Sequence, residues 1–155
     1  MELSYGAVCF DLFGTLVEPD GLAVRGAREA LELLPAQRWA IVTSCGSRFA
    51  GALLDSAGLP VPHVLIAADH VTAGKPSAQP YLAGAKALGF DPGDVLCVED
   101  SRDGIAAGRA AGMDVLAILR GRGLSFAQGA SFQVERFDEI RWKTTGDQIS
   151  VVIPR

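Results

Sequence analysis

Short apolar runs of strand length alternate with segments of helical composition along most of this chain. The runs cover residues 7–10, 39–42, 64–66, 95–98 and 115–118, and helical patterns occupy 22–34, 47–57, 79–88 and 104–111 between them. Continuous apolar strands separated by helices are typical of a parallel sheet that is covered on both faces. The sequence therefore predicts an α/β fold of three layers around a five-stranded parallel sheet.

The pattern changes beyond Gly121, where glycine- and serine-containing loop sequence replaces the alternation. A terminal hairpin is predicted there, with Trp142 on one strand, residues 149–153 on the other and a turn at 145–147. The chain shows no internal repeat, linker or low-complexity tract. We therefore expect a single domain over residues 1–155 with a short C-terminal β extension.

Composition excludes several classes of protein. Of the 155 residues, 49% are hydrophobic and 21% are charged, which argues against disorder. The net charge of −4 gives no electrostatic reason to expect a nucleic acid partner. No apolar run of about 18 residues predicts a membrane span, and the first residues lack the build of a secretory signal. Three cysteines, an odd number in apolar stretches, favour a reducing compartment, so we expect a cytoplasmic protein.

Polar side chains stand where the predicted strands end. Asp11 and Thr43 follow the first and second runs, and the Glu99-Asp100 pair follows the fourth. Lys75, one of only three lysines against eleven arginines, lies between a glycine and a proline after the third run. Because ligands bind at the carboxyl ends of the strands of an open parallel sheet, these groups should converge. A carboxylate, a hydroxyl, a cation and an acidic metal site together suit phosphoryl transfer.

Each of these residues also has a purely structural explanation. Asp11 could be a turn residue, Thr43 and Ser44 could cap the following helix, and Lys75 could be a solvated loop charge. Glu99, Asp100 and Ser101 could be an N-cap cluster that favours the dipole of the following helix. Four such coincidences at four strand ends are much less expected than one, so the sequence favours a shared site.

Four motifs resemble those of the haloacid dehalogenase (HAD) superfamily. They are FDLFGTL at 10–16, IVTS at 41–44, GKP at 74–76 and VEDS at 98–101. Residues 39–112 are especially similar to the sugar-phosphate and polyol-phosphate phosphatases and the β-phosphoglucomutases of that superfamily. The resemblance implies a Rossmannoid core with strand order 5-4-1-2-3 and a small phosphorylated substrate.

The resemblance also implies roles for the motif residues. Asp11 would attack phosphorus and form an aspartyl phosphate, while Lys75 and Thr43 would neutralise and hydrogen-bond the phosphoryl group. Mg²⁺ would be bound by Asp11, the backbone carbonyl of Phe13 and Asp100, an oxygen-only ligand set. Gly14, Thr15 and Ser44 would also bind the phosphate. Glu99 would support the metal ligands from behind or act through a metal-bound water.

Two departures from the family pattern stand out. Most phosphatases of the superfamily carry an aspartate two residues after the nucleophile, and Phe13 occupies that place here. Phenylalanine cannot transfer a proton, so a general acid–base contribution of about 10²- to 10⁴-fold is missing unless Ser44, Asp103 or another group supplies it. Good leaving groups, as in acyl or aryl phosphates, would suffer least.

The second departure is the absence of a cap. Related proteins insert a helical domain of about 60 residues or more after the first motif, whereas Thr43 follows Leu16 after only 27 residues. We therefore expect an open site, which a second copy of the chain in a homo-oligomer could cover.

The sequence favours a phosphohydrolase, and two alternative functions stay open. A Mg²⁺-dependent phosphohydrolase suits the acidic fourth motif. A dehalogenase-type hydrolase is the alternative suggested by an aromatic residue at position 13, and a catalytically silent domain that binds phosphate or Mg²⁺ is the third. Arg48, Arg102 and Asp103 could also face a substrate, but the sequence favours solvated positions for the two arginines and a helix-dipole role for Asp103.

Overall fold

The computed structural model describes residues 1–155, and its central element is a six-stranded sheet in which every neighbouring pair is parallel. In spatial order the strands are β4 (Leu65–Ile66), β3 (Trp39–Val42), β2 (Ala7–Phe10), β5 (Val95–Glu99), β6 (Asp114–Ile118) and β7 (Phe132–Val134). The five predicted strands occur in the predicted order. The predicted number of five is wrong, because β7 adds a sixth strand beside β6. With three residues and an exposed centre, β7 has no apolar run that would have identified it.

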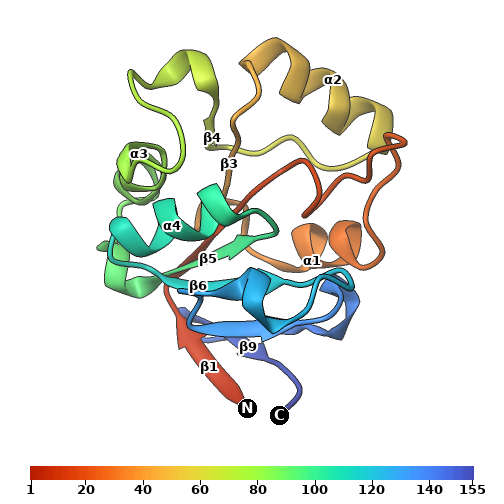
Figure 1. The fold of residues 1–155 in the computed structure, drawn as a ribbon, viewed down its shortest axis with the longest axis vertical. Coiled ribbons are helices and arrows are strands. Elements are labelled where there is room, and N and C mark those ends of the chain that lie inside the picture. Colours follow the sequence, from red (N-terminus) through yellow and green to blue (C-terminus); the bar gives the residue numbers. More distant parts are fainter.

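Four helices connect and cover these strands (Figure 1). They are α1 (Ala27–Leu33), α2 (Ser47–Ala57), α3 (Gln79–Leu88) and α4 (Arg102–Ala110). The helix expected over 22–34 begins only at Ala27, because Ala23 forms a bridge with Val17 and Gly26 adopts a left-handed φ of 89°. None of the helices is long and apolar enough to cross a bilayer.

The sheet separates two apolar cores, as strand alternation requires. On one face Val8, Phe10 and Ile41 pack with residues of α1 and α2. On the other face Cys9 and Val42 pack with residues of α3 and α4, which lie side by side in Figure 1. This is the three-layer arrangement expected from the continuous apolar runs.

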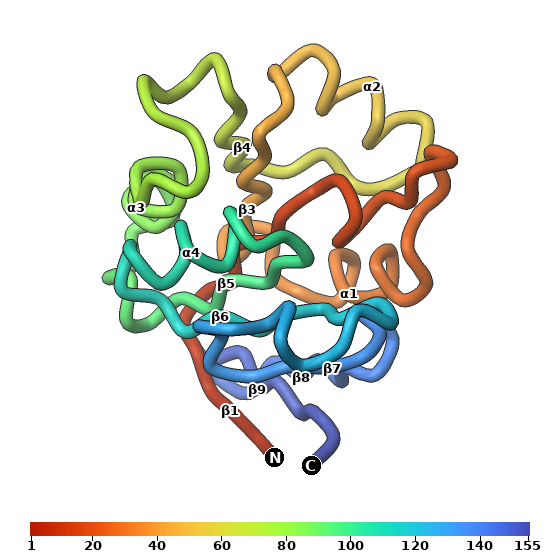
Figure 2. Tube along the Cα trace, viewed as in Figure 1, coloured from red at the N-terminus to blue at the C-terminus, as the bar shows by residue number.

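A second, antiparallel sheet packs against the first core. Its order is β1 (Glu2–Tyr5), β9 (Gln148–Val152) and β8 (Arg141–Thr145), so the predicted C-terminal hairpin is present and the N-terminal strand joins it. The rings of Phe10, Phe137 and Trp142 join the two sheets, with Phe10 and Trp142 centroids 5.5 Å apart. The chain termini therefore lie close together, as Figure 2 shows.

Strand register determines where the site forms. Phe10 pairs with Val98 on one side and with Ile41 on the other. The residues that follow, Asp11 and Glu99, therefore lie at one edge of the sheet, where the backbone N–H of Asp11 donates to the carbonyl of Val98 at 3.0 Å.

Candidate active site

Asp11 lies at the floor of this edge with its side chain only 10% exposed. Its Oδ1 accepts a hydrogen bond from Lys75 Nζ at 2.8 Å, and its Oδ2 accepts one from Thr15 Oγ1 at 3.2 Å. Burial, reinforced by Asp100 and opposed by the charge of Lys75, raises the pKa of Asp11 to about 6. The carboxylate is thus held beside one cation among other acids.

Lys75 reaches the same point from the loop before α3. Its Nζ, in a side chain 4% exposed, donates to Asp11 Oδ1, to Glu99 Oε1 at 2.6 Å and to the carbonyl of Val42 at 2.9 Å. Burial alone would lower the pKa of Lys75, but the two carboxylates raise it above its ordinary value. The ammonium is therefore a permanent positive charge with all three of its protons directed at acceptors.

Glu99 is completely buried and points into the protein. Its Oε1 accepts from Lys75 and from the hydroxyl of Tyr81 at 2.6 Å, and its Oε2 accepts from Ser101 Oγ at 3.2 Å. Burial and the charge of Asp11 raise the pKa of Glu99, while Lys75 opposes them. With this many donors around it, Glu99 anchors the lysine instead of facing the pocket.

Asp11, Glu99 and Asp100 form an acidic cluster, and of these three Asp11 and Asp100 line the pocket. Oxygen atoms of Asp11, Glu99 and Asp100 all lie within 4.8 Å of one another. Thr15 Oγ1 lies 3.2 Å from Asp11 Oδ2 and 3.3 Å from Asp100 Oδ1. Carboxylate oxygens at this spacing are the hard ligands that Mg²⁺ prefers, so the residues present fit that ion.

Glycine is required at position 14 because the backbone there approaches Asp100 closely. An added Cβ would lie 2.0 Å from Asp100 Oδ2, and Gly14 adopts a φ of 89°. The carbonyl of Gly14 accepts a hydrogen bond from Arg120 Nη1 at 2.5 Å, and Arg120 Nη2 pairs with Glu18 at 2.5 Å. Arg120 thus ties the loop after Asp11 to the end of β6.

Thr43 and Ser44 line the site from the end of β3. Thr43 is buried, and its Oγ1 accepts from the backbone N–H of Cys45 at 3.2 Å. The expectation that these residues cap α2 is wrong, because Gly46 is the N-cap and the first backbone N–H of the helix, that of Ser47, donates to Asp69 Oδ1 at 2.7 Å. At α4, Ser101 does cap the helix through Gly104 N at 3.0 Å. The capping explanation therefore applies to the fourth motif in part and to the second not at all.

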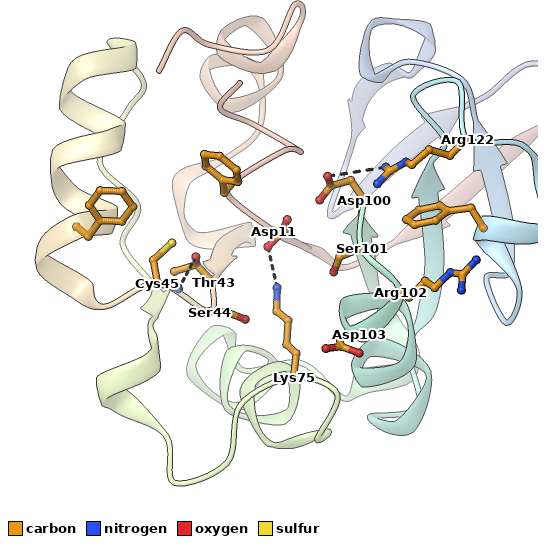
Figure 3. A pocket seen from close by; sticks show the side chains of 13 residues that line it. Asp11, Thr43, Ser44, Cys45, Lys75, Asp100, Ser101, Arg102, Asp103 and Arg122 are labelled. Carbon is orange, nitrogen blue, oxygen red and sulfur yellow. Dashed lines mark hydrogen bonds and ion pairs between the residues drawn. The ribbon is translucent and has the colours of Figure 1, made fainter. Parts of the chain in front are cut away.

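These groups meet in an open pocket of about 850 Å³, shown in Figure 3. Arg102 and Asp103 line it, whereas Arg48 does not. The full lining is Asp11, Phe13, Thr43, Ser44, Cys45, Phe49, Lys75, Asp100, Ser101, Arg102, Asp103, Arg122 and Phe126.

Sequence reasoning missed three residues. Tyr81 looks like an ordinary apolar-face residue of a helix, yet its hydroxyl reaches Glu99. Arg122 reaches Asp100 with Nη2 at 3.9 Å from Oδ2, and Arg120 holds Gly14. For the two arginines, the sequence offers one signal, the unusual run Arg120-Gly121-Arg122-Gly123. This run follows the fifth predicted strand and thus belongs to the same edge of the sheet.

Comparison with known proteins gives one consistent family. A family model described as haloacid dehalogenase-like hydrolase matches residues 20–112, more than half of the chain. Hexitol phosphatase A of Escherichia coli is 45% identical over 80 residues, which are 52% of this chain and 37% of that protein. Glycerol-1-phosphate phosphohydrolase 2 of Saccharomyces cerevisiae is 36% identical over 121 residues, 72% of this chain and 48% of that protein. The chain thus spans about half or less of the length of these relatives.

A solved structure shows the same fold. A HAD family hydrolase from Deinococcus radiodurans with bound phosphate and sodium superposes with a TM-score of 0.76 at 22% identity. The match covers 87% of this chain and 93% of that one.

Proposed function

Because this chain belongs to the haloacid dehalogenase-like hydrolase family, we propose that it hydrolyses phosphate monoesters through Asp11 with the help of Mg²⁺. The observation that supports this most directly is the position of Asp11, which lies buried between Lys75 Nζ at 2.8 Å and the carboxylate of Asp100. A nucleophilic carboxylate needs a neighbouring cation before it can approach an anionic phosphate.

The chain's own residues account for the first half of the reaction. An oxygen of Asp11 attacks phosphorus, the bond from phosphorus to the ester oxygen breaks, and the electron pair leaves with that oxygen. Lys75 neutralises charge shared between Asp11 and the phosphoryl oxygens, while Thr43 and Ser44 donate hydrogen bonds to them. Asp11, Asp100 and the carbonyl of Phe13 would bind Mg²⁺, which would offset the charge that develops on the phosphoryl group.

Water completes the cycle by attacking phosphorus of the aspartyl phosphate. This step releases inorganic phosphate and a proton and restores the carboxylate of Asp11. Phe13 cannot take that proton, and Ser44 and Asp103, which line the same pocket, are the candidates for this role. We therefore expect slow turnover of substrates whose leaving oxygen must be protonated.

Acetyl phosphate and p-nitrophenyl phosphate test this function because their leaving groups, acetate and p-nitrophenolate, depart without a proton donor. We expect phosphate release that requires Mg²⁺ and stops with EDTA. Asp11→Asn should abolish it, and acid-quenched wild-type enzyme should contain phosphate bound covalently to Asp11 by mass spectrometry.

Two results would overturn the proposal. Release of halide from 2-haloacids without a metal would identify a dehalogenase. No turnover of either phosphate compound, combined with Mg²⁺ binding that is lost in Asp100→Asn by calorimetry, would identify a silent binding domain.

A further inference from the structure

Three phenylalanines line the pocket around Asp11. Phe13 is 45% exposed and Phe49, from α2, is 58% exposed, while Phe126 is partly buried. Other exposed apolar side chains, such as Val61 and Leu82, lie outside the pocket. Large apolar side chains gathered at one site, and exposed there, mark a place where a ligand covers them.

One wall of the pocket is built from two arginines beside the ring of Phe126. Arg122 places its guanidinium 3.7 Å from the centre of the Phe126 ring, and Arg102 lies 5.8 Å from the same ring. Arg122 is fixed by donating to the carbonyls of Leu119 at 2.9 Å and Ile118 at 3.1 Å. In Figure 3 both arginines lie across Asp11 from Cys45, near the start of α2. Aromatic side chains therefore line the pocket both beside these arginines and on α2.

The chemistry of the leaving group points the same way. Phe13 stands where the family resemblance would place a proton donor, so the leaving oxygen departs as an anion. A phenol has an ordinary pKa of about 10, whereas an aliphatic alcohol ionises almost as reluctantly as water. Phenolates are therefore tolerable leaving groups for this site, and alkoxides are not.

Accepting the proposed phosphatase function, we propose that the substrate of this pocket is an aryl phosphate, whose ring lies against Phe13 and Phe49. In the reaction Asp11 bonds to phosphorus, the bond between phosphorus and the phenolic oxygen breaks, and the phenolate takes its proton from solvent. Apolar contact with the ring replaces the contacts that a cap would supply. The phenol can belong to a small metabolite or to a tyrosine side chain, because both offer an aromatic ring and a phenolate leaving group.

Relative rates on aryl and alkyl phosphate esters test the proposal. We expect wild-type kcat/KM for phenyl phosphate to exceed that for glycerol 1-phosphate by roughly 100-fold or more, because only the phenolate leaves without a proton donor. Within a series of substituted phenyl phosphates, kcat should rise steeply as the leaving phenol becomes more acidic. Free phosphotyrosine and a phosphotyrosyl peptide, compared at equal concentration, distinguish a small from a macromolecular substrate.

Phe49→Ala separates ring binding from chemistry. In this variant the ratio of kcat/KM for phenyl phosphate to that for acetyl phosphate should fall by about 2- to 10-fold, the usual worth of an aromatic contact. Leu82→Ala, which truncates an exposed apolar residue of α3 outside the pocket, should leave the ratio unchanged. Circular dichroism checks that both variants fold.

The outcomes separate the two proposals. Turnover of acetyl phosphate without an aryl preference, or with an unchanged ratio in Phe49→Ala, overturns this inference and leaves the proposed function intact. No turnover of any ester overturns both. A change of oligomeric state in Phe49→Ala by light scattering would show that Phe49 covers a subunit interface, and would also overturn the inference.

Discussion

The hydroxyl of Tyr81 and the ammonium of Lys75 both donate to the same oxygen, Oε1 of Glu99, each at 2.6 Å. Lys75 Nζ also lies 5.2 Å from the centre of the Tyr81 ring. Glu99 is therefore fixed from both sides, and it fixes the lysine that faces Asp11. Tyr81 acts at one remove from the pocket as a positioning residue.

Replacing Tyr81 with phenylalanine should lower kcat by about 3- to 30-fold, because a buried carboxylate loses a donor worth roughly 1–2 kcal/mol and Lys75 is held less firmly. The chain offers a matched control, since its other tyrosine, Tyr5, donates to Asp114 at 2.8 Å away from the pocket. Tyr5→Phe should cost similar stability in urea unfolding and leave kcat close to wild type. Equal kcat losses in the two variants would contradict a positioning role.

Neutralising Asp11 should stabilise the metal-free protein at neutral and alkaline pH. The pKa of Asp11 is raised from 3.8 to about 6 in the folded protein, mainly by burial. Between these values the unfolded chain binds fewer protons than the folded one, so stability falls as pH rises from about 4 to 6 and stays low above that. Asp11→Asn removes this loss, which we expect to reach about 2–3 kcal/mol at pH 8.

The measurement is chemical unfolding of both proteins in EDTA at several pH values. The stability difference should shrink toward zero below about pH 3, where Asp11 is protonated in both the folded and the unfolded state. Added Mg²⁺ should stabilise wild type more than Asp11→Asn, because the ion binds only the folded site. A difference that does not depend on pH would show that Asp11 is not the buried acid responsible.

Gly104 in α4 should not tolerate a side chain. An added Cβ would lie 1.9 Å from the Cδ of Glu99, and the completely buried carboxylate has no room to move. We expect Gly104→Ala to cost about 2–4 kcal/mol and to disorder the Lys75 contact. Gly51→Ala in α2 meets nothing within 4 Å and should instead stabilise by up to about 1 kcal/mol. Thermal unfolding of the two variants tests this opposite sign.

The sequence predicted the sheet and the convergence of Asp11, Lys75 and Asp100 for a simple reason. Both follow from local patterns plus one topological rule, that parallel strands end at a common edge. Tyr81 could not be predicted, because its place on an apolar helix face is that of any core residue and only the packing of α3 on the sheet directs its hydroxyl to Glu99. The contact between Arg120 and Gly14 could not be predicted either, because the two residues are 106 positions apart and only the tertiary structure brings them together.

Removing the Arg120 side chain should loosen the loop that contains the carbonyl of Phe13. Arg120 adopts a positive φ of 52° and makes charge-assisted hydrogen bonds to Gly14 and Glu18. We expect Arg120→Ala to raise the Mg²⁺ concentration for half-maximal activity by roughly 3- to 10-fold. Arg136→Ala, which removes an exposed arginine paired only with Asp138 and Glu139, should leave it unchanged.

Placing an acid at position 13 tests most directly whether the lack of a proton donor there limits the turnover of alkyl phosphates. Phe13 is 45% exposed and lines the pocket, so Phe13→Asp places a carboxyl there without burying a charge in the core. A proton donor should raise kcat/KM for glycerol 1-phosphate by about 10-fold or more, because the alkoxide no longer leaves unprotonated. Phenyl phosphate should gain much less, since its leaving group needs little help, and it loses the contact with the Phe13 ring.

Phe13→Asn is the control, because it has nearly the same shape as the aspartate variant and cannot transfer a proton at neutral pH. A rise in both variants would mean that removing the phenylalanine, by making room in the pocket, is what matters. A rise in neither would mean that Ser44, Asp103 or solvent already supplies the proton. Only a gain confined to Phe13→Asp, and larger for the alkyl than for the aryl ester, agrees with a site that selects its substrate by the acidity of the leaving group.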